Sequence, residues 1–267
     1  MDATSLVING AAGRMGRRLV ALASEDAELK VVAALERSAH PDLGKDAGFL
    51  AGTGPLGVPL TDTLSASADV LIDFSSPDST RQRLAECLAR HVGMVIGTTG
   101  LTEQVQEDIR HASSTIPILY SPNMSVGVNL LFQLVGQVAR VLGKAYDIEI
   151  VEAHHRFKKD APSGTARRLA ELVAESLSLN LDQAACYGRQ GITGERPAQQ
   201  IGIHAIRGGD IVGEHTVSFI ALGERVELRH VAQSRDTFVR GALRAAKFLA
   251  GKPPGLYTME HALGLEV

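Results

Sequence analysis

Short apolar runs alternate with longer amphipathic segments along residues 1–120 of the chain. An apolar run bounded by turn residues is typical of a buried strand, whereas apolar residues spaced three and four apart indicate a helix. This alternation predicts a parallel sheet covered by helices on both faces. The predicted strands are 6–9, 29–35, 70–74, 94–96 and 116–120. One predicted helix begins at Met15, and two others cover 79–91 and 103–113.

The pattern changes after residue 122, where a second architecture is expected to begin. One long apolar helix and one strand are predicted first, at 126–142 and 147–153. Gly-rich turns then join three strand-like runs, which is typical of an antiparallel meander. These runs are 201–207, 214–222 and 225–232. A last amphipathic helix is predicted at 237–249, and we expect it to return to the first domain.

A glycine-rich turn follows the first predicted strand. Gly10, Gly13 and Gly16 stand where backbone N–H groups can approach a pyrophosphate and the helix dipole favours its charge. The GxxGxxG spacing alone is a weak signal, because small residues at a helix start also serve packing. However, Glu36 stands 20 residues after Gly16, at the end of the second strand, where an acidic side chain hydrogen-bonds the ribose of a dinucleotide. Together these features predict a nicotinamide dinucleotide site.

Two arginines and a second turn extend this predicted site. Arg14 and Arg37 could receive a 2′-phosphate, because a guanidinium suits bidentate phosphate contact, so we expect both NADH and NADPH to bind. The Gly-Thr-Thr-Gly turn at 97–100 follows another strand at the carboxyl edge of the sheet, where such sheets bind ligands. It would contact the nicotinamide ribose and carboxamide, unless it is an ordinary turn.

The chain is therefore expected to have the α/β fold class, with a Rossmann-like dinucleotide-binding domain and a second α+β domain built on a mainly antiparallel sheet. The first domain is expected at residues 1–125, completed by 235–267, and the second, for the substrate, at 126–234.

Composition and charge narrow the possible partners. The net charge of −3 gives no overall attraction for nucleic acid, so any anion site must be local. No basic segment followed by a long apolar run opens the chain, so neither a signal peptide nor a membrane partner is expected. Cys87 and Cys186 lie far apart, which argues against a disulfide or thiolate metal site. We expect two buried thiols and a cytoplasmic location.

The segment 152–165 (EAHHRFKKDAPSGT) carries the most unusual set of side chains. It leaves a predicted strand, crosses a cationic loop and enters a helix for which Ser163 is the candidate N-cap. A histidine such as His154 can donate a proton to a developing carbanion, and a lysine supplies positive charge or a proton. The backbone N–H groups of Gly164 and Thr165 would hold a carboxylate at the helix start. The segment therefore predicts a site for an anionic substrate.

Other interpretations of this segment stay open. A loop rich in Lys and Arg can simply be a solvated surface. His154 and His155 could bind zinc, but adjacent histidines lack the i, i+4 spacing of a helical metal pair, so no metal is expected. If the strand continues through both histidines, they point to opposite faces and have different roles.

Several of these segments together resemble the dihydrodipicolinate reductase family of the bacterial diaminopimelate route to lysine. The resemblance spans nearly the whole chain, and the central segment is its most specific part. The matching segments are 7–16 (VINGAAGRMG), 97–100 (GTTG), 125–129 (SVGVN), 152–166 (EAHHRFKKDAPSGTA) and 208–215 (GGDIVGEH).

The resemblance implies a role for each matching position. It implies that His154 is the general acid and base, that Lys158 is a second proton donor, and that the substrate is bound by His155, Gly164 and Thr165. It also implies a homotetramer assembled through the sheet of the second domain. The cofactor residues that it implies are Gly10, Ala11, Ala12, Gly13, Arg14, Met15, Glu36, Arg37, Gly97, Thr98, Thr99, Ser121, Pro122, Asn123 and Met124.

The resemblance and the residues together predict an NAD(P)H-dependent reductase of 4-hydroxy-2,3,4,5-tetrahydrodipicolinate in that pathway. Hydride would reach C4 of a cyclic unsaturated imine and a proton the adjacent carbon, with water lost from the hydroxylated precursor. The two carboxylates of such a substrate would account for a cationic loop beside a helix start. Two alternatives stay open: a dehydrogenase of another small acid, of the aspartate-semialdehyde or homoserine type, and a non-catalytic NAD(P)H sensor.

Overall fold

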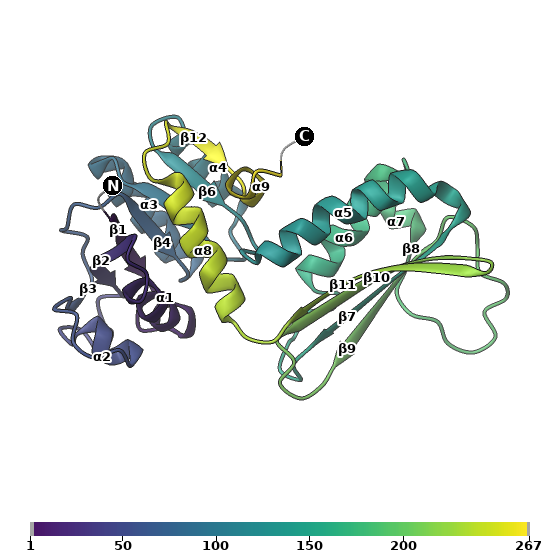
Figure 1. Cartoon of the computed structure of the whole chain (residues 1–267), viewed down its shortest axis with the longest axis horizontal. Helices are drawn as coiled ribbons and strands as arrows, with labels where there is room; N and C mark the ends of the chain where they lie inside the picture. Colours follow the sequence, from purple (N-terminus) through teal and green to yellow (C-terminus); the bar gives the residue numbers. More distant parts are fainter. Residues whose placement is uncertain (1–2, 266–267) are drawn as a thin grey trace. The chain divides into compact units, whose positions relative to one another are not determined.

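The computed structural model describes residues 3–265, and the chain divides into two compact units (Figure 1). Unit 1 contains the chain up to Val126 and again from Asp236 onward, and unit 2 is Gly127–Arg235. Both units combine a sheet with helices, which confirms the predicted α/β fold class.

Unit 1 is built on a parallel sheet with the strand order β12-β6-β5-β4-β1-β2-β3. The order reverses between β1 and β4, and this is where open α/β sheets place a ligand, at the carboxyl ends of the strands. Its strands are β1 (Thr4–Asn9), β2 (Leu29–Leu35), β3 (Leu60–Thr61), β4 (Val70–Asp73), β5 (Gly93–Ile96), β6 (Pro117–Tyr120) and β12 (Gly255–Tyr257).

Two hydrophobic cores cover the two faces of this sheet. Leu6 and Ile8 of β1 belong to one core and Val7 to the other, as the alternation of side chains along a strand requires. The first core is closed by α1 (Arg14–Ser24), α2 (Ala47–Ala51), α8 (Asp236–Leu249) and α9 (Met259–Leu263), and the second by α3 (Pro77–Arg90) and α4 (Glu103–Ala112). Helix α8 therefore belongs to unit 1, although it follows unit 2 along the chain.

Unit 2 has a mixed sheet with the order β11-β10-β7-β9-β8. Helix α5 (Val126–Leu142) and helix α6 (Gly164–Ser176) pack on one face of it. The strands are β7 (Asp147–His154), β8 (Ala185–Cys186), β9 (Ile201–Arg207), β10 (Gly213–Ala221) and β11 (Glu224–Ala232), and two short helices, η1 (Gly143–Ala145) and α7 (Leu181–Ala184), complete the unit.

The predicted antiparallel meander was wrong in one respect. Strands β10 and β11 form the expected hairpin, but β9 does not pair with β10. Strand β7 lies between them, antiparallel to β10 and parallel to β9, so the sheet is mixed instead of mainly antiparallel. The partner of an apolar strand depends on tertiary packing, which the turn after β9 does not specify.

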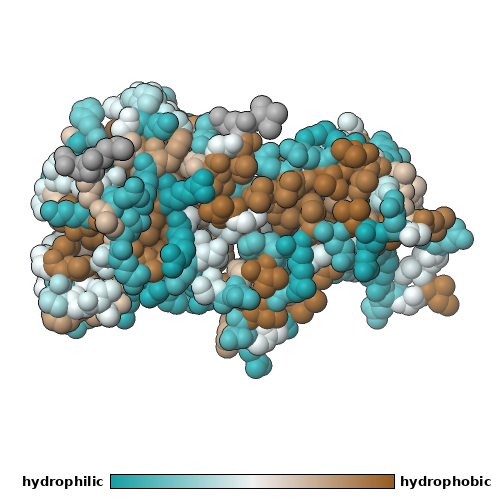
Figure 2. Space-filling model, in the orientation of Figure 1, coloured by the Kyte–Doolittle hydropathy of each residue, from teal (hydrophilic) through white to brown (hydrophobic). Residues whose placement is uncertain are grey.

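Helix α5 is apolar along its length and is only partly buried. By length and composition alone, residues Val126–Ala145 could cross a membrane, with 33% of the apolar window buried. This is weak evidence for a membrane span, because a core helix passes the same test. Leu131, Val135 and Ala139 face the core of unit 2. Leu130, Leu134 and Val141 of α5 are exposed. Figure 2 shows a band of apolar surface, coloured brown, where α5 lies in Figure 1.

The two cysteines differ in their surroundings, and both are free thiols. Cys87 is completely buried in α3, and this burial raises its pKa to about 12. Cys186 in β8 is only half-buried. The expectation of two buried thiols is therefore confirmed for Cys87 and wrong for Cys186.

Candidate active site

The glycine turn in unit 1 has a backbone shape that larger residues could not adopt. Gly10 has a φ of +74°, and a Cβ at this position would lie 2.6 Å from the carbonyl oxygen of Phe74. A Cβ at Gly16 would collide with the carbonyl oxygen of Gly10. The two glycines thus let helix α1 begin directly above the carboxyl end of β1.

The first turn of α1 is suited to bind an anion. Gly13 is the N-cap and has no side chain to cap the helix. The first N–H groups of α1 therefore have no acceptor within the helix and point outward from its positive end. Glu36 lies at the edge of the same turn, where its Oε2 accepts a long hydrogen bond of 3.4 Å from the N–H of Ala12. The donor set fits a dinucleotide, with the helix start for its phosphates and a carboxylate for its ribose.

The arginines expected beside this turn, Arg14 and Arg37, both have exposed side chains. They follow the uncapped helix start and Glu36 directly in the chain, so the structure leaves both guanidinium groups accessible at this edge of unit 1.

The 97–100 turn is held in shape by contacts with neighbouring residues of unit 1. A Cβ at Gly97 would collide with the ring of Phe74. Thr98 is buried, and its Oγ1 accepts from the N–H of Ser75 at 2.9 Å and donates to Asp73 Oδ2 at 2.9 Å. Thr99 is exposed at the end of the turn. Gly97 and Thr98 thus hold the turn in place, and Thr99 is accessible.

The strand-end segment 121–124, like the 97–100 turn, has both buried and accessible residues. Ser121 is buried, and its Oγ donates to the carbonyl oxygen of Asn123 at 2.8 Å. Met124 is buried in the first core of unit 1. Pro122 is exposed and Asn123 half-buried, so these two residues form the accessible part of the segment.

A buried carboxylate beneath these turns was not predicted from the sequence. Asp73, at the end of β4, is completely buried. Its Oδ1 accepts from Asn9 Nδ2 at 2.7 Å, and its Oδ2 accepts from the hydroxyls of Thr80 and Thr98. These hydrogen bonds tie the carboxyl ends of β1 and β4 to α3 and to the 97–100 turn. The sequence did contain a signal for this cluster: Asp73 is a polar residue at the end of the otherwise apolar strand β4.

In unit 2, the segment 152–165 folds into a compact cluster. Strand β7 ends at His154, so His155 lies outside the strand and the test of alternation between the two histidines does not apply. Ser163 is the N-cap of α6 as predicted, because its Oγ accepts from the N–H of Ala166 at 3.2 Å. The Ser163 hydroxyl also lies 3.1 Å from Nε2 of His215, which comes from β10. The cluster therefore joins β7, β10 and the start of α6.

Glu152 is at the centre of this cluster and is completely buried. It accepts hydrogen bonds from Arg207 of β9, from His154 and from the N–H of Ser163. Burial opposes its ionisation, but Arg207, His154 and Ser163 outweigh burial and hold the pKa of the carboxyl below its usual range. Glu152 is therefore an anion in the folded protein. The prediction of site residues missed it, although it opens the central motif.

His154 is kept neutral by its surroundings. Burial lowers its pKa, the carboxylate of Glu152 opposes this effect, and the charges of Lys158 and Arg207 lower the pKa further. The His215 ring stands edge-on to His154, with ring centroids 5.2 Å apart, and burial lowers the pKa of His215 to about 3. Both rings are therefore neutral near pH 7 before any substrate is bound.

The remaining predicted residues of this motif lie around His154. Lys158 Nζ forms an ion pair of 3.0 Å with Asp160 and is close enough to affect the pKa of His154. His155 is half-buried, with its ring 6.2 Å from that of Phe157. A Cβ at Gly164, the first residue of α6, would meet no atom within 4 Å, so the space beside this residue is open. This space can receive a carboxylate.

The chain matches models of known families in both units. Residues 4–124 match "Dihydrodipicolinate reductase, N-terminus", and residues 127–263 match "Dihydrodipicolinate reductase, C-terminus". The chain belongs to the dihydrodipicolinate reductase family.

Individual relatives of this family cover nearly the whole chain. A 4-hydroxy-tetrahydrodipicolinate reductase from Anaeromyxobacter dehalogenans (strain 2CP-1 / ATCC BAA-258) is 53% identical over 265 residues, 98% of both chains. One from Syntrophotalea carbinolica (strain DSM 2380 / NBRC 103641 / GraBd1) is 48% identical over 264 residues, 98% of this chain and 99% of the relative. Among solved structures, the dipicolinate-bound dihydrodipicolinate reductase from Paenisporosarcina sp. TG-14 has a TM-score of 0.76, 24% identity and coverage of 97% and 98% of the two chains. The family resemblance that we inferred from the motifs is confirmed.

No metal site accompanies the reductase motifs in the described residues 3–265. No group of three or more His, Cys, Asp and Glu side chains there is placed to hold a metal ion. His154 is instead hydrogen-bonded to Glu152, and His155 points to Phe157.

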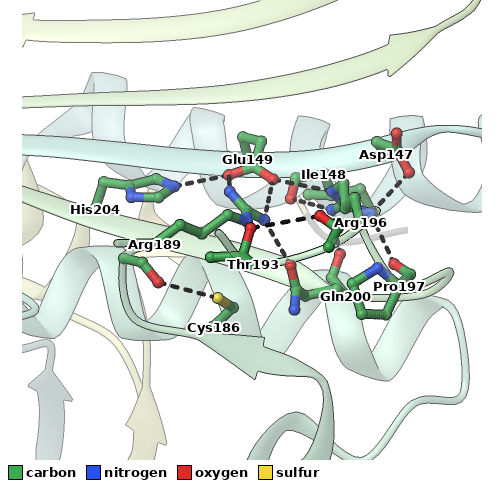
Figure 3. A network of polar contacts seen from close by, with 12 residues as sticks. Asp147, Ile148, Glu149, Cys186, Arg189, Thr193, Arg196, Pro197, Gln200 and His204 are labelled. Carbon is green, nitrogen blue, oxygen red and sulfur yellow. Dashed lines mark hydrogen bonds and ion pairs between the residues drawn. The ribbon is translucent and has the colours of Figure 1, made fainter. Parts of the chain in front are cut away.

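A second cluster of polar contacts in unit 2 surrounds the carboxylate of Glu149 (Figure 3). Glu149 Oε1 accepts from Arg189 at 2.8 Å and from Arg196 at 3.1 Å, and Oε2 lies 2.7 Å from His204. Both arginines come from the segment between β8 and β9, so the cluster ties this long segment to β7.

The Glu149 cluster predicts a pH-dependent part of the stability. Burial opposes its ionisation, but Arg189, His204 and Arg196 lower its pKa to about 2. A carboxyl whose pKa falls on folding contributes stability above its ordinary pKa and loses it as the pH falls from about 4.5 towards 2. The free energy of unfolding of the whole chain, measured in urea at pH 7 and at pH 3, gives its loss in acid. We expect this loss to be smaller in Glu149→Gln than in the wild type, by on the order of 2–3 kcal/mol.

Glu214→Gln is the matched control, because Glu214 has only its more exposed pair with Arg229. We expect it to leave the pH dependence as in the wild type. A Glu149→Gln variant whose stability falls with acid as steeply as that of the wild type would contradict the assignment.

Proposed function

We propose that this chain catalyses the NAD(P)H-dependent reduction of 4-hydroxy-2,3,4,5-tetrahydrodipicolinate to 2,3,4,5-tetrahydrodipicolinate, with loss of water, in the diaminopimelate route to lysine. The observation that carries the proposal is the 53% identity with a curated reductase over 98% of both chains. The two groups of residues described above, one in each unit, supply what such a reaction needs from the protein: a dinucleotide site and a proton donor beside an anion site.

The cofactor is proposed to bind at the carboxyl edge of the unit 1 sheet. When bound, the reduced nicotinamide supplies the hydride. The N–H groups of Arg14 and Met15 in the first turn of α1 would hold the phosphates, with residues 10–13 shaping the turn that brings them there, and Glu36 would hold the adenosine ribose. Arg14 and Arg37 would receive the extra phosphate of NADPH. Thr99, Pro122 and Asn123 are the accessible residues of the other two segments and would contact the nicotinamide end, with Gly97, Thr98, Ser121 and Met124 holding those segments in shape.

The substrate is proposed to be a small dicarboxylate held by the 155–165 segment. One carboxylate would bind at the start of α6, where the space beside Gly164 is open, through the N–H groups of Gly164 and Thr165. His155 and Lys158 would face the other carboxylate and the ring nitrogen. The dihydrodipicolinate reductase from Paenisporosarcina sp. TG-14, which binds dipicolinate, supports a ligand of this chemical class.

Proton transfer is assigned to His154, with Lys158 as a second donor. A neutral His154 can take up a proton at Nε2 when an anionic substrate approaches, because the new negative charge favours the imidazolium. It can then deliver that proton to the carbon next to the site of hydride addition. Lys158 would protonate or stabilise the ring nitrogen, where negative charge also develops.

The protein is proposed to act as a homotetramer in the cytoplasm. One face of the unit 2 sheet packs on α5 and α6, whereas the opposite face carries Val151, Ile206 and Val231. Ile206 and Val231 are exposed in the single chain. Apolar side chains on an open sheet face are typical of a surface that a partner covers. Sedimentation equilibrium tests this assembly.

A coupled assay tests the function directly. The preceding synthase makes the unstable substrate in the cuvette, and oxidation of NADH or NADPH by the purified protein is followed at 340 nm. We expect turnover with both cofactors. Binding of NADPH without turnover would favour a sensor instead, and turnover only with another small acid would favour a different dehydrogenase.

Arg37→Ala is expected to separate the two cofactors. Loss of a guanidinium–phosphate contact should weaken NADPH by about 1–3 kcal/mol and leave NADH nearly unchanged. Dissociation constants from fluorescence titration of the two reduced cofactors measure this difference. Arg90→Ala is the control, because Arg90 is also exposed but ends α3 at the opposite edge of the sheet. An equal loss for both cofactors would refute the phosphate role.

A further inference from the structure

Glu152 occupies a position at which the fold would normally place an apolar residue. Side chains alternate along β7, and Ile148 and Ile150 point into the core of unit 2 between the sheet and its helices. Glu152 is the next residue on that face and is 0% exposed. An ionised carboxylate at such a depth is unfavourable unless all its lone pairs are used. The chain therefore keeps this carboxylate for a purpose other than packing.

Every acceptor position of Glu152 is filled, and the donors come from β9, from the N-cap of α6 and from β7 itself. Oε1 accepts from Arg207 Nη2 at 2.7 Å and from the N–H of Ser163 at 3.0 Å. Oε2 accepts from Arg207 Nη1 at 2.8 Å and from His154 Nδ1 at 2.6 Å. Arg207 is itself held, since Nη2 also donates to the carbonyl oxygen of Asp160 at 2.7 Å. The carboxylate is thus fastened from β9 and from α6, and its remaining position faces His154.

This arrangement decides where His154 carries its proton. An ionised carboxylate is only an acceptor, so His154 must keep a proton on Nδ1 to donate to it. Nε2 is then the nitrogen left for proton exchange. Gly213 stands opposite, and a Cβ at that position would lie only 3.2 Å from Nε2, so the absence of a side chain leaves room there. The charged and titratable groups that act on the ring are Glu152 of β7, Lys158 of the loop, Arg207 of β9 and His215 of β10.

We propose that Glu152, held in place by Arg207, is a positioning residue that fixes the His154 ring with Nδ1 protonated and Nε2 free to pass its proton to the substrate. This inference rests on the proposed function of His154 as the acid. It goes further in assigning the orientation and the tautomer of the ring to one buried carboxylate and one arginine outside the 152–165 segment.

Glu152→Gln is the sharpest substitution for this proposal. At the Oε1 position two groups, Arg207 and the Ser163 N–H, can only donate, so the amide oxygen is expected to stay there. The amide NH2 then faces His154 and can only donate to it. Nδ1 of His154 must therefore be the unprotonated acceptor, and the ring proton moves to Nε2. The variant therefore keeps the shape of the side chain but reverses the tautomer.

Kinetics over a pH range provide the first test. We expect Glu152→Gln to lower kcat/KM on the order of 10- to 100-fold. The rate falls as the pH rises and His154 loses its proton, and without the neighbouring carboxylate this fall should move to lower pH by about one unit. Loss of activity with the wild-type pH profile would mean that Glu152 is only structural, and would overturn the proposal. Glu149→Gln is the matched control, because Glu149 lies on the same strand and, like Glu152, binds arginine and histidine side chains; it should leave the profile unchanged (Figure 3).

The tautomer itself provides a second test that does not depend on activity or on a stable Glu152 variant. Nitrogen-15 NMR of the wild-type chain, with His154 assigned by its loss in His154→Gln, is expected to show a neutral ring protonated at Nδ1. A ring protonated at Nε2 would overturn the proposal even in an active enzyme. If the wild type shows no turnover but its ring is protonated at Nδ1, the proposed function fails while the positioning by Glu152 stands.

Discussion

His154→Ala is expected to lower kcat on the order of 10²-fold or more while the chain stays folded. The reason is that the variant removes the proposed proton donor but leaves Glu152 with its bonds to Arg207 and to the Ser163 N–H. The coupled assay measures kcat, and circular dichroism with a urea melt measures the fold. Turnover at the wild-type rate would remove His154 from the mechanism.

Lys158→Ala is expected to show a similar loss for the same reason. Lys158 forms an ion pair with Asp160, whose side chain is 63% exposed, so the stability of the chain should change little. Lys159→Ala is the matched control, since Lys159 is the neighbouring lysine of the same loop and is exposed. If both lysine variants lost the same activity, the general charge of the loop, and not a proton from Lys158, would be responsible.

Arg83→Met is expected to destabilise the chain by about 3–5 kcal/mol, the largest stability effect that we predict. Arg83 lies in α3 and is only 2% exposed. Its Nε donates to Asn9 Oδ1 at 3.1 Å, Nη1 forms an ion pair of 2.8 Å with Glu86, and Nη2 donates to the carbonyl oxygen of Asp62 at 2.9 Å. Removal of the guanidinium leaves these acceptors without their partner at the carboxyl edge of the sheet.

The free energy of unfolding in urea measures this loss, and Arg81→Met provides the control. Arg81 belongs to the same helix, but it is 64% exposed and pairs only with Asp108. We expect that variant to lose less than about 1 kcal/mol. Equal losses in the two variants would show that the buried network around Asn9 and Asp73 contributes no more than a surface ion pair.

This network and the Glu152 cluster have a common design. In each unit a carboxylate buried at the end of a strand is saturated with hydrogen bonds and holds together the loops that carry the proposed contacts. Asp73 holds the turns expected around the cofactor, and Glu152 holds His154 and the start of α6. Buried polar networks of this kind specify one geometry, because any rearrangement leaves a charge unsatisfied.

Most long helices and strands could be predicted, because the spacing of apolar residues within each of them depends only on residues nearby in the chain. The strand 29–35 and the helix 126–142 have the predicted bounds in the structure, and the hairpin after residue 213 follows from its glycine turn. The short elements α2, β3, α7 and β8 were missed, since two to five residues contain too little of a period to detect. The segment 152–165 could be singled out as a candidate site because it combines rare residue types in one continuous stretch of chain.

The amino-acid sequence by itself determined the family, the glycine turn, the N-cap at Ser163 and the set of titratable side chains in 152–165, because each depends on neighbours in the chain. Only the tertiary structure decided that β7 lies between β9 and β10, and therefore that Arg207 and His215 reach the motif. It also decided that the side chains of Glu152 and Asp73 are completely buried. Such contacts join residues more than 50 positions apart, and their energies depend on burial and on the partner strand, neither of which a local pattern contains.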